Sequence, residues 1–77
     1  METVARRIRE LVATKFDVDK AALAPHADLS DELGADSLDL VELMIAIEAL
    51  FEIHIPDEDF AELQTLSEVA GYVAGRL

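Results

Sequence analysis

One serine stands between carboxylates where a loop gives way to a long amphipathic pattern. Ser37 directly follows Asp36, and Asp39 comes two positions later. A nucleophilic serine needs an adjacent base, and nothing close to Ser37 in the sequence could activate it. An exposed serine on a rigid element, without a base, suits a residue that receives a covalent group. We therefore predict that Ser37 is a modification site and that the chain has no catalytic residue.

The sequence allows two other interpretations of this serine. A hydrolase is the enzymatic alternative, but the motif Gly-x-Ser-x-Gly is absent. His26 and His54 show no pairing with a nucleophile, and we expect both on loop surfaces. The second alternative is purely structural, because Asp36 is a good N-cap and Asp39 at the third helical position favours the positive helix end.

No metal site is predicted. The acidic stretch 28–39 superficially resembles a calcium loop. Its glycine falls at position seven rather than six, however, and its last ligand is aspartate rather than glutamate.

Four helices must position the serine. Thr3 can cap a first helix, whose apolar residues follow helical spacing: Val4, Ile8, Leu11 and Val12. A second helix should run from Asp36 to about Phe51. Pro56 with Asp57 opens a short helical turn through Phe60 and Leu63. The capping box 65–68 starts a last helix, with Leu66, Val69, Ala70 and Val73 facing inward.

The stretch 21–35 lacks helical periodicity and contains Pro25. We predict a long loop there, with Leu23, Leu29 and Leu33 as anchors against the core; a connection of this length is more often functional than idle. The fold class is all-α, a small four-helix bundle of three longer helices and one short helix. Residues 1–77 form a single domain.

The second helix has two apolar faces. One faces the core and contains Leu40, Leu43, Met44, Ile47, Leu50 and Phe51. The opposite stripe contains Leu38, Val41, Ile45 and Ala49, flanked by Glu42, Glu48 and Glu52. Such a stripe is either covered by the long loop or kept for a partner. Partner docking is favoured because carboxylates fit poorly under a loop. The predicted partner-binding residues are Asp36, Leu38, Asp39, Val41, Glu42, Ile45 and Glu48.

Charge is distributed unevenly along the chain, whose net charge is −11. Five of the six basic residues lie in the first twenty positions, and none lies between Ala21 and Gly75, against thirteen Asp and Glu. Such a surface repels nucleic acid and anionic lipid and attracts basic protein patches. Solubility alone, or an acidic inhibitor that mimics nucleic acid, would also explain it.

Cysteine is absent, which excludes disulfides and thiolate chemistry and fits a reducing compartment. No signal peptide is visible, and no apolar run approaches the ~18 residues of a membrane span. We expect a cytoplasmic monomer without membrane insertion.

The sequence from Asp31 to Asp59 resembles the acyl carrier proteins, and the resemblance extends over nearly the whole chain. The residues 33–39, Leu-Gly-Ala-Asp-Ser-Leu-Asp, are similar to their phosphopantetheine attachment motif. Further matches are Val41-Glu42-Leu43, Ala46-Ile47-Glu48, Phe51, Ile53, the residues 55–59 and Tyr72. The resemblance implies that a transferase joins 4′-phosphopantetheine to Ser37 by a phosphodiester bond. It also implies that Asp36, Asp39 and Glu42 help to dock the transferase and the acyl-processing enzymes.

The resemblance further implies a non-catalytic carrier of acyl thioesters in fatty acid or related lipid biosynthesis. The Asp-Ser-Leu form is more similar to fatty-acid and polyketide carriers than to peptidyl carriers. Four places depart from the commonest pattern: Leu40, Ala49-Leu50, His54 and Phe60. These departures keep open a discrete carrier of a specialised polyketide-type pathway.

Overall fold

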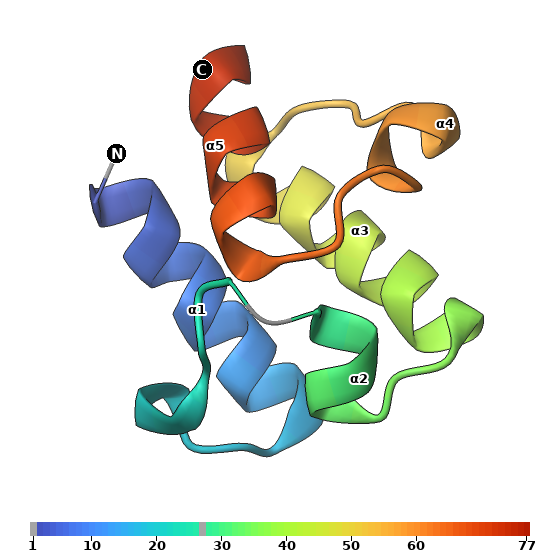
Figure 1. Ribbon diagram of the computed structural model, residues 1–77. Coiled ribbons are helices and arrows are strands. Elements are labelled where there is room, and N and C mark those ends of the chain that lie inside the picture. Colours follow the sequence, from blue (N-terminus) through green and yellow to red (C-terminus); the bar gives the residue numbers. More distant parts are fainter. Residues whose placement is uncertain (1, 27) are drawn as a thin grey trace.

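Three long helices pack around one core in the computed structural model (Figure 1), which describes residues 2–26 and 28–77. They are α1 (Glu2–Phe16), α3 (Ser37–Phe51) and α5 (Leu66–Arg76). Shorter elements complete the chain: a 3-10 turn η1 (Lys20–Ala22), α2 (Leu29–Leu33) and α4 (Asp57–Phe60). The all-α class and its three longer helices are confirmed.

The first helix ends where its sequence pattern ends, but it begins earlier than predicted. Thr3 already lies inside α1, which starts at Glu2, so its assignment as the N-cap was wrong. Asp17 then takes the left-handed conformation with φ 55°, and the Val18 N–H bonds to the Ala13 carbonyl at 3.0 Å. This turn satisfies one of the carbonyls that every helix leaves free at its end.

The predicted loop 21–35 is not a loop throughout, because it contains η1 and α2. Asp28 caps α2 by accepting bonds from the backbone N–H groups of Ser30 and Asp31. Gly34 ends it in the left-handed conformation with φ 63°, which glycine adopts at little cost. The caps at both ends thus stabilise α2, although its five residues are too few to show helical periodicity in the sequence. The predicted anchors are confirmed: Leu23 and Leu29 are buried and Leu33 packs against the core.

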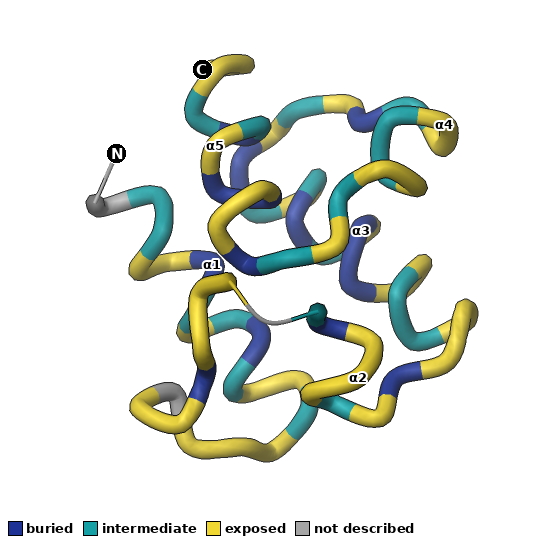
Figure 2. Tube along the Cα trace, viewed as in Figure 1, coloured by how far each residue is buried: buried dark blue, intermediate teal, exposed yellow. Residues whose placement is uncertain are grey.

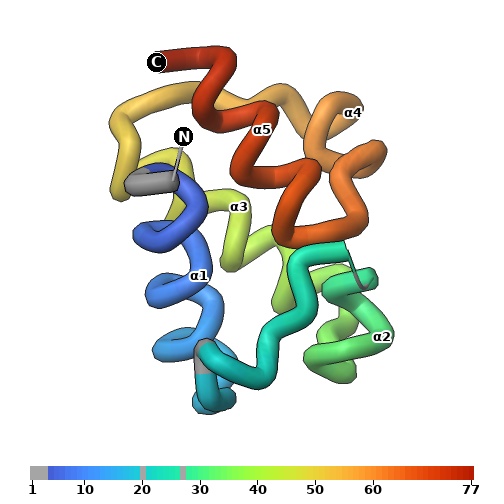
Figure 3. The backbone as a smooth tube through the Cα atoms, turned by 60° about the vertical axis from the view of Figure 1, so that its left-hand side comes forward, coloured from blue at the N-terminus to red at the C-terminus, as the bar shows by residue number. Residues whose placement is uncertain are grey.

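The 21–35 segment is fastened to the start of α5. The Leu29 N–H donates to the Gln64 carbonyl at 2.8 Å, and the Ser67 N–H donates to the Pro25 carbonyl at 2.9 Å. Figure 3 shows the segment passing beside the first turn of α5. These bonds hold the beginning of α2 against the α4–α5 connection.

The core is aliphatic and central. Its buried residues come mainly from the facing sides of the three long helices (Figure 2) and include Ile8, Val12, Leu43, Ile47, Val69 and Val73, all with no exposed surface. Within the described residues no polar or charged side chain is buried. The core face predicted for the second helix is confirmed, with Leu43, Met44, Ile47 and Phe51 buried.

Candidate functional site

Ser37 is the first residue of α3 and is exposed. Asp36 is the N-cap: its Oδ1 accepts the Asp39 N–H at 2.8 Å, and its own N–H donates to Asp39 Oδ2 at 3.2 Å. This reciprocal capping box satisfies backbone donors that the first turn would otherwise leave open. The Ser37 hydroxyl therefore projects from a backbone whose conformation is fixed on both sides.

The turn before Asp36 is also fixed. Ser30 Oγ donates to the Ala35 carbonyl at 3.1 Å, and the Ala35 N–H donates to the Ser30 carbonyl at 3.1 Å. Ala35 itself is buried. Ser30 thus has a structural role in the α2–α3 turn, whereas Ser37 makes no side-chain hydrogen bond within the described residues. This difference leaves the Ser37 hydroxyl free for a covalent partner.

An apolar cavity of about 450 Å³ opens beside Ser37, between α2, α3 and α4. Its apolar lining consists of Leu29, Leu40, Val41, Met44, Phe60, Ala61 and Leu63. Polar residues contribute the rest of the lining: Asp28, Ser30, Ser37, Asp57 and Gln64. A chain attached at Ser37 could enter this space and leave water.

The second stripe of α3 faces solvent. Leu38, Val41 and Ile45 are 64%, 45% and 56% exposed, and Ala49 is also exposed. The alternative that the 21–35 segment covers this stripe is therefore wrong. Leu38, Val41, Ile45 and Ala49 form what we call the α3 stripe. Contiguous exposed apolar patches in other proteins are frequently interaction surfaces.

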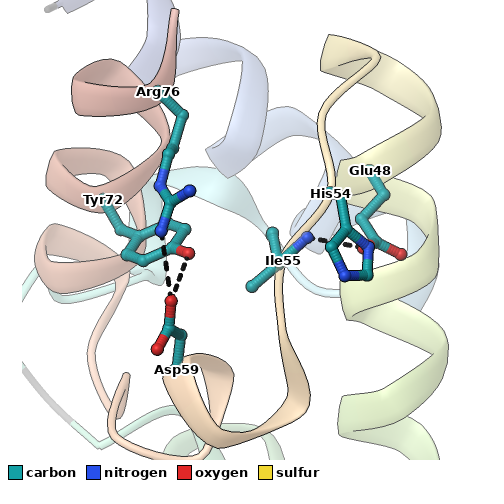
Figure 4. Close-up of polar contacts among 6 residues, drawn as sticks. All are labelled: Glu48, His54, Ile55, Asp59, Tyr72 and Arg76. Atoms are coloured by element: carbon teal, nitrogen blue, oxygen red, sulfur yellow. Dashed lines mark hydrogen bonds and ion pairs between the residues drawn. The ribbon is translucent and has the colours of Figure 1, made fainter.

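Two of the three glutamates that flank the α3 stripe have partners within the chain. Glu48 Oε2 accepts the Ile55 N–H at 2.7 Å and lies 3.2 Å from His54 Nδ1 (Figure 4). Glu42 Oε1 lies 3.6 Å from the Lys15 ammonium on α1. The structure thus brings the predicted partner-binding residues together on α3, but it turns Glu48 toward the segment after the helix.

A polar cluster that the sequence patterns did not reveal joins α4 to α5. Asp59 Oδ2 accepts the Tyr72 hydroxyl at 2.7 Å and the Arg76 guanidinium at 3.1 Å (Figure 4). Arg76 also stacks over the Tyr72 ring at 4.7 Å. Desolvation and the hydrogen bond to Asp59 raise the pKa of Tyr72, and the positive charge of Arg76 opposes them. The i, i+4 spacing of Tyr72 and Arg76 could have suggested their contact, but not Asp59. This cluster steadies α4, which forms one wall of the cavity.

His54 and the acidic side chains are the residues that the sequence analysis considered as a catalytic base and as metal ligands. His54 contacts Glu48 rather than Ser37. No group of three or more His, Cys, Asp or Glu residues among those described could hold a metal ion. Among the described helices, none is long and apolar enough to cross a bilayer.

Comparison with known proteins supports the resemblance to acyl carrier proteins. Residues 6–73 match the family model described as the phosphopantetheine attachment site. The chain is 40% identical over 76 residues to an acyl carrier protein of Syntrophobacter fumaroxidans, covering 96% of this chain and 94% of the relative.

Two solved structures share the fold. One is an acyl carrier protein from Enterococcus faecalis, with a TM-score of 0.84 at 24% identity, covering 99% of this chain and 96% of that one. The other, from Anaplasma phagocytophilum, is assigned as an acyl carrier protein. It has a TM-score of 0.86 at 28% identity and covers 95% of this chain and 86% of that one.

Proposed function

Because the chain belongs to the acyl carrier protein family, whose cofactor is 4′-phosphopantetheine, we propose that Ser37 holds this group. The thiol of phosphopantetheine carries acyl groups as thioesters. The protein itself is then a non-catalytic carrier, which presents acyl intermediates to the enzymes of fatty acid or related lipid biosynthesis.

The observation that carries this proposal is an exposed, unbonded serine hydroxyl at the start of a capped helix, beside an apolar cavity. A phosphodiester on Ser37 would stand at the positive end of α3, which favours anions. The carboxylates of Asp36 and Asp39 do not block it, because they bond to each other's backbone N–H groups. The residues present therefore fit the group.

The cavity supports a second part of the proposal, which is that the acyl chain shelters between α2, α3 and α4. Leu40, Met44 and Phe60 offer it an apolar surface. Each methylene that leaves water contributes at most ~0.8 kcal/mol, less the cost of opening the bundle. A thioester held in this way stays away from solvent between enzymes.

The α3 stripe supports docking of the transferase and of acyl-processing enzymes. Leu38, Val41 and Ile45 offer apolar contact next to Ser37. Asp36, Asp39 and Glu42 add negative charge, which speeds the approach of basic protein patches. Glu48 has its carboxylate on the Ile55 N–H, so we assign it to the α3–α4 connection instead. The negative charge of the surface argues against nucleic acid as a partner. We propose that the carrier is a cytoplasmic monomer.

One feature favours a discrete carrier of a specialised polyketide-type pathway as a second candidate. Ala49 extends the exposed stripe with an apolar residue. A partner that binds this face would contact the C-terminal half of α3 with apolar side chains rather than with additional cations.

The test is the intact mass after incubation with coenzyme A and a broad-specificity phosphopantetheinyl transferase. A carrier gains one phosphopantetheine. Ser37→Ala should keep its helical circular dichroism and gain nothing, whereas Ser67→Ala should load like the wild type. A mass increment in Ser37→Ala would contradict the proposal.

A further inference from the structure

Lys15 stands beside the proposed docking face and holds its central carboxylate. The Lys15 ammonium lies 3.6 Å from Glu42 Oε1, across the contact between α1 and α3. The Lys15 side chain is only 28% exposed, while that of Glu42 is 53% exposed. Lys15 is thus an exposed residue whose side chain is partly covered, and about half of the Glu42 side chain stays accessible to a partner.

Glu42 is the carboxylate in the middle of α3 that a partner can still reach. Glu48 is only 22% exposed and bonds to the Ile55 N–H. Asp36 and Asp39 cap the helix end and are tied to each other's backbone. The Lys15 ammonium therefore offsets part of the negative charge next to Val41 and Ile45.

We propose that the Lys15–Glu42 ion pair slows docking of the phosphopantetheinyl transferase on the α3 stripe, because a basic side chain of the transferase must compete with Lys15 for Glu42. This inference rests on the proposed carrier function. A surface ion pair of this kind is weak enough to be exchanged. It nevertheless lowers the local negative charge that draws a basic partner in.

The experiment measures kcat/KM for loading by the broad-specificity transferase at about 0.01 M ionic strength, where charges act over about 30 Å. Lys15→Gln should raise this value about two- to fivefold, the range expected for removing one exposed ion pair. Near 1 M salt the difference should vanish. Lys15→Arg keeps the charge and should load as slowly as the wild type.

The matched control is Arg6→Gln, which removes one positive charge from an exposed position on the same helix. It should accelerate loading less than Lys15→Gln does. In a Glu42→Gln background, Lys15→Gln should lose its advantage and match Arg6→Gln. Melting curves of each variant check that α1 stays folded, because Lys15 also stabilises the last turn of that helix.

Equal effects of Lys15→Gln and Arg6→Gln would overturn the proposal, since net charge alone would then set the rate. A Lys15→Gln effect that persists without Glu42 would overturn it as well. Either result leaves the carrier function intact as long as every variant gains one phosphopantetheine, whereas failure of the wild type to load would contradict the function itself.

Discussion

Glu48 Oε2 accepts the backbone N–H of Ile55 at 2.7 Å, and this bond closes the connection between α3 and α4. Ile55 is 1% exposed, so its side chain is a fixed part of the core. Glu52 helps to shape the same connection by taking the left-handed conformation, with φ 55°. A carboxylate on the partner-facing helix thereby sets the position of α4 and of the cavity wall.

We expect Glu48→Ala to lower the free energy of unfolding by about 1–3 kcal/mol, because it leaves a partly buried N–H without an acceptor. Glu48→Gln keeps an acceptor oxygen and should cost less. Urea denaturation measures both, with the exposed Glu52→Gln as the control. If Glu48→Ala is as stable as that control, the bond has no structural role.

Tyr72 gives a prediction for alkaline pH. Its pKa is raised in the folded protein by desolvation and by the bond to Asp59. A group whose folded pKa is raised stabilises the fold fully below its unfolded pKa, which is about 10 for tyrosine, and loses this contribution as pH rises through the folded pKa. Stability should therefore fall above about pH 10.

Tyr72→Phe separates this effect from general alkaline unfolding. The variant keeps the ring under Arg76 but loses the hydroxyl that bonds to Asp59. It should melt at a lower temperature than the wild type near neutral pH, and the gap should narrow above about pH 10. Since Tyr72 is the only tyrosine in the sequence, tyrosinate absorbance follows its titration directly. A midpoint at or below that of the unfolded chain would contradict the contact.

The cavity predicts how acyl length affects stability. Longer acyl groups on the loaded protein should raise the melting temperature until the 450 Å³ beside Ser37 is filled. Ala61→Leu adds volume to the lining and should bring the plateau to a shorter chain. Calorimetry on a series of acyl lengths measures this. A melting temperature that does not depend on length would mean that the chain stays outside the bundle.

The apolar α3 stripe and the carboxylates that flank it should respond differently to salt. Val41→Ala should weaken transferase binding at every salt concentration, because apolar burial is not screened. Glu42→Lys should slow loading mainly at low salt, since rim charges chiefly affect the rate of encounter. Both residues are exposed, and Val41 lies at the edge of the cavity rather than in the core, so circular dichroism should be unchanged. Wild-type loading by Glu42→Lys at low salt would show that the acidic face serves solubility only.

The sequence was sufficient for features whose partners lie within one turn. The Asp36–Asp39 capping box, the Thr65–Glu68 box and the periodicity of α3 are all local. The Ser37 environment was therefore predictable before the fold was known. The helix α2 was missed because five residues are too few to show a period, although its caps at Asp28 and Gly34 were in the sequence.

The contacts between elements could not be predicted in the same way. Glu42 and Glu48 belong to one acidic flank by spacing, yet one pairs with Lys15 on α1 and the other bonds to Ile55. Their different roles depend on how α1 and the α3–α4 connection pack against α3. The spacing of residues along the sequence does not show how these separate elements pack together.

The most direct measurement locates the phosphopantetheine on the chain. The wild-type protein is loaded with coenzyme A and the transferase, and the intact product is fragmented in the mass spectrometer. The account predicts that fragments ending before Ser37 keep their unmodified mass and that those including Ser37 carry the full increment. An increment assigned to Ser30 or Ser67, or no increment under conditions that load a known carrier, would contradict it.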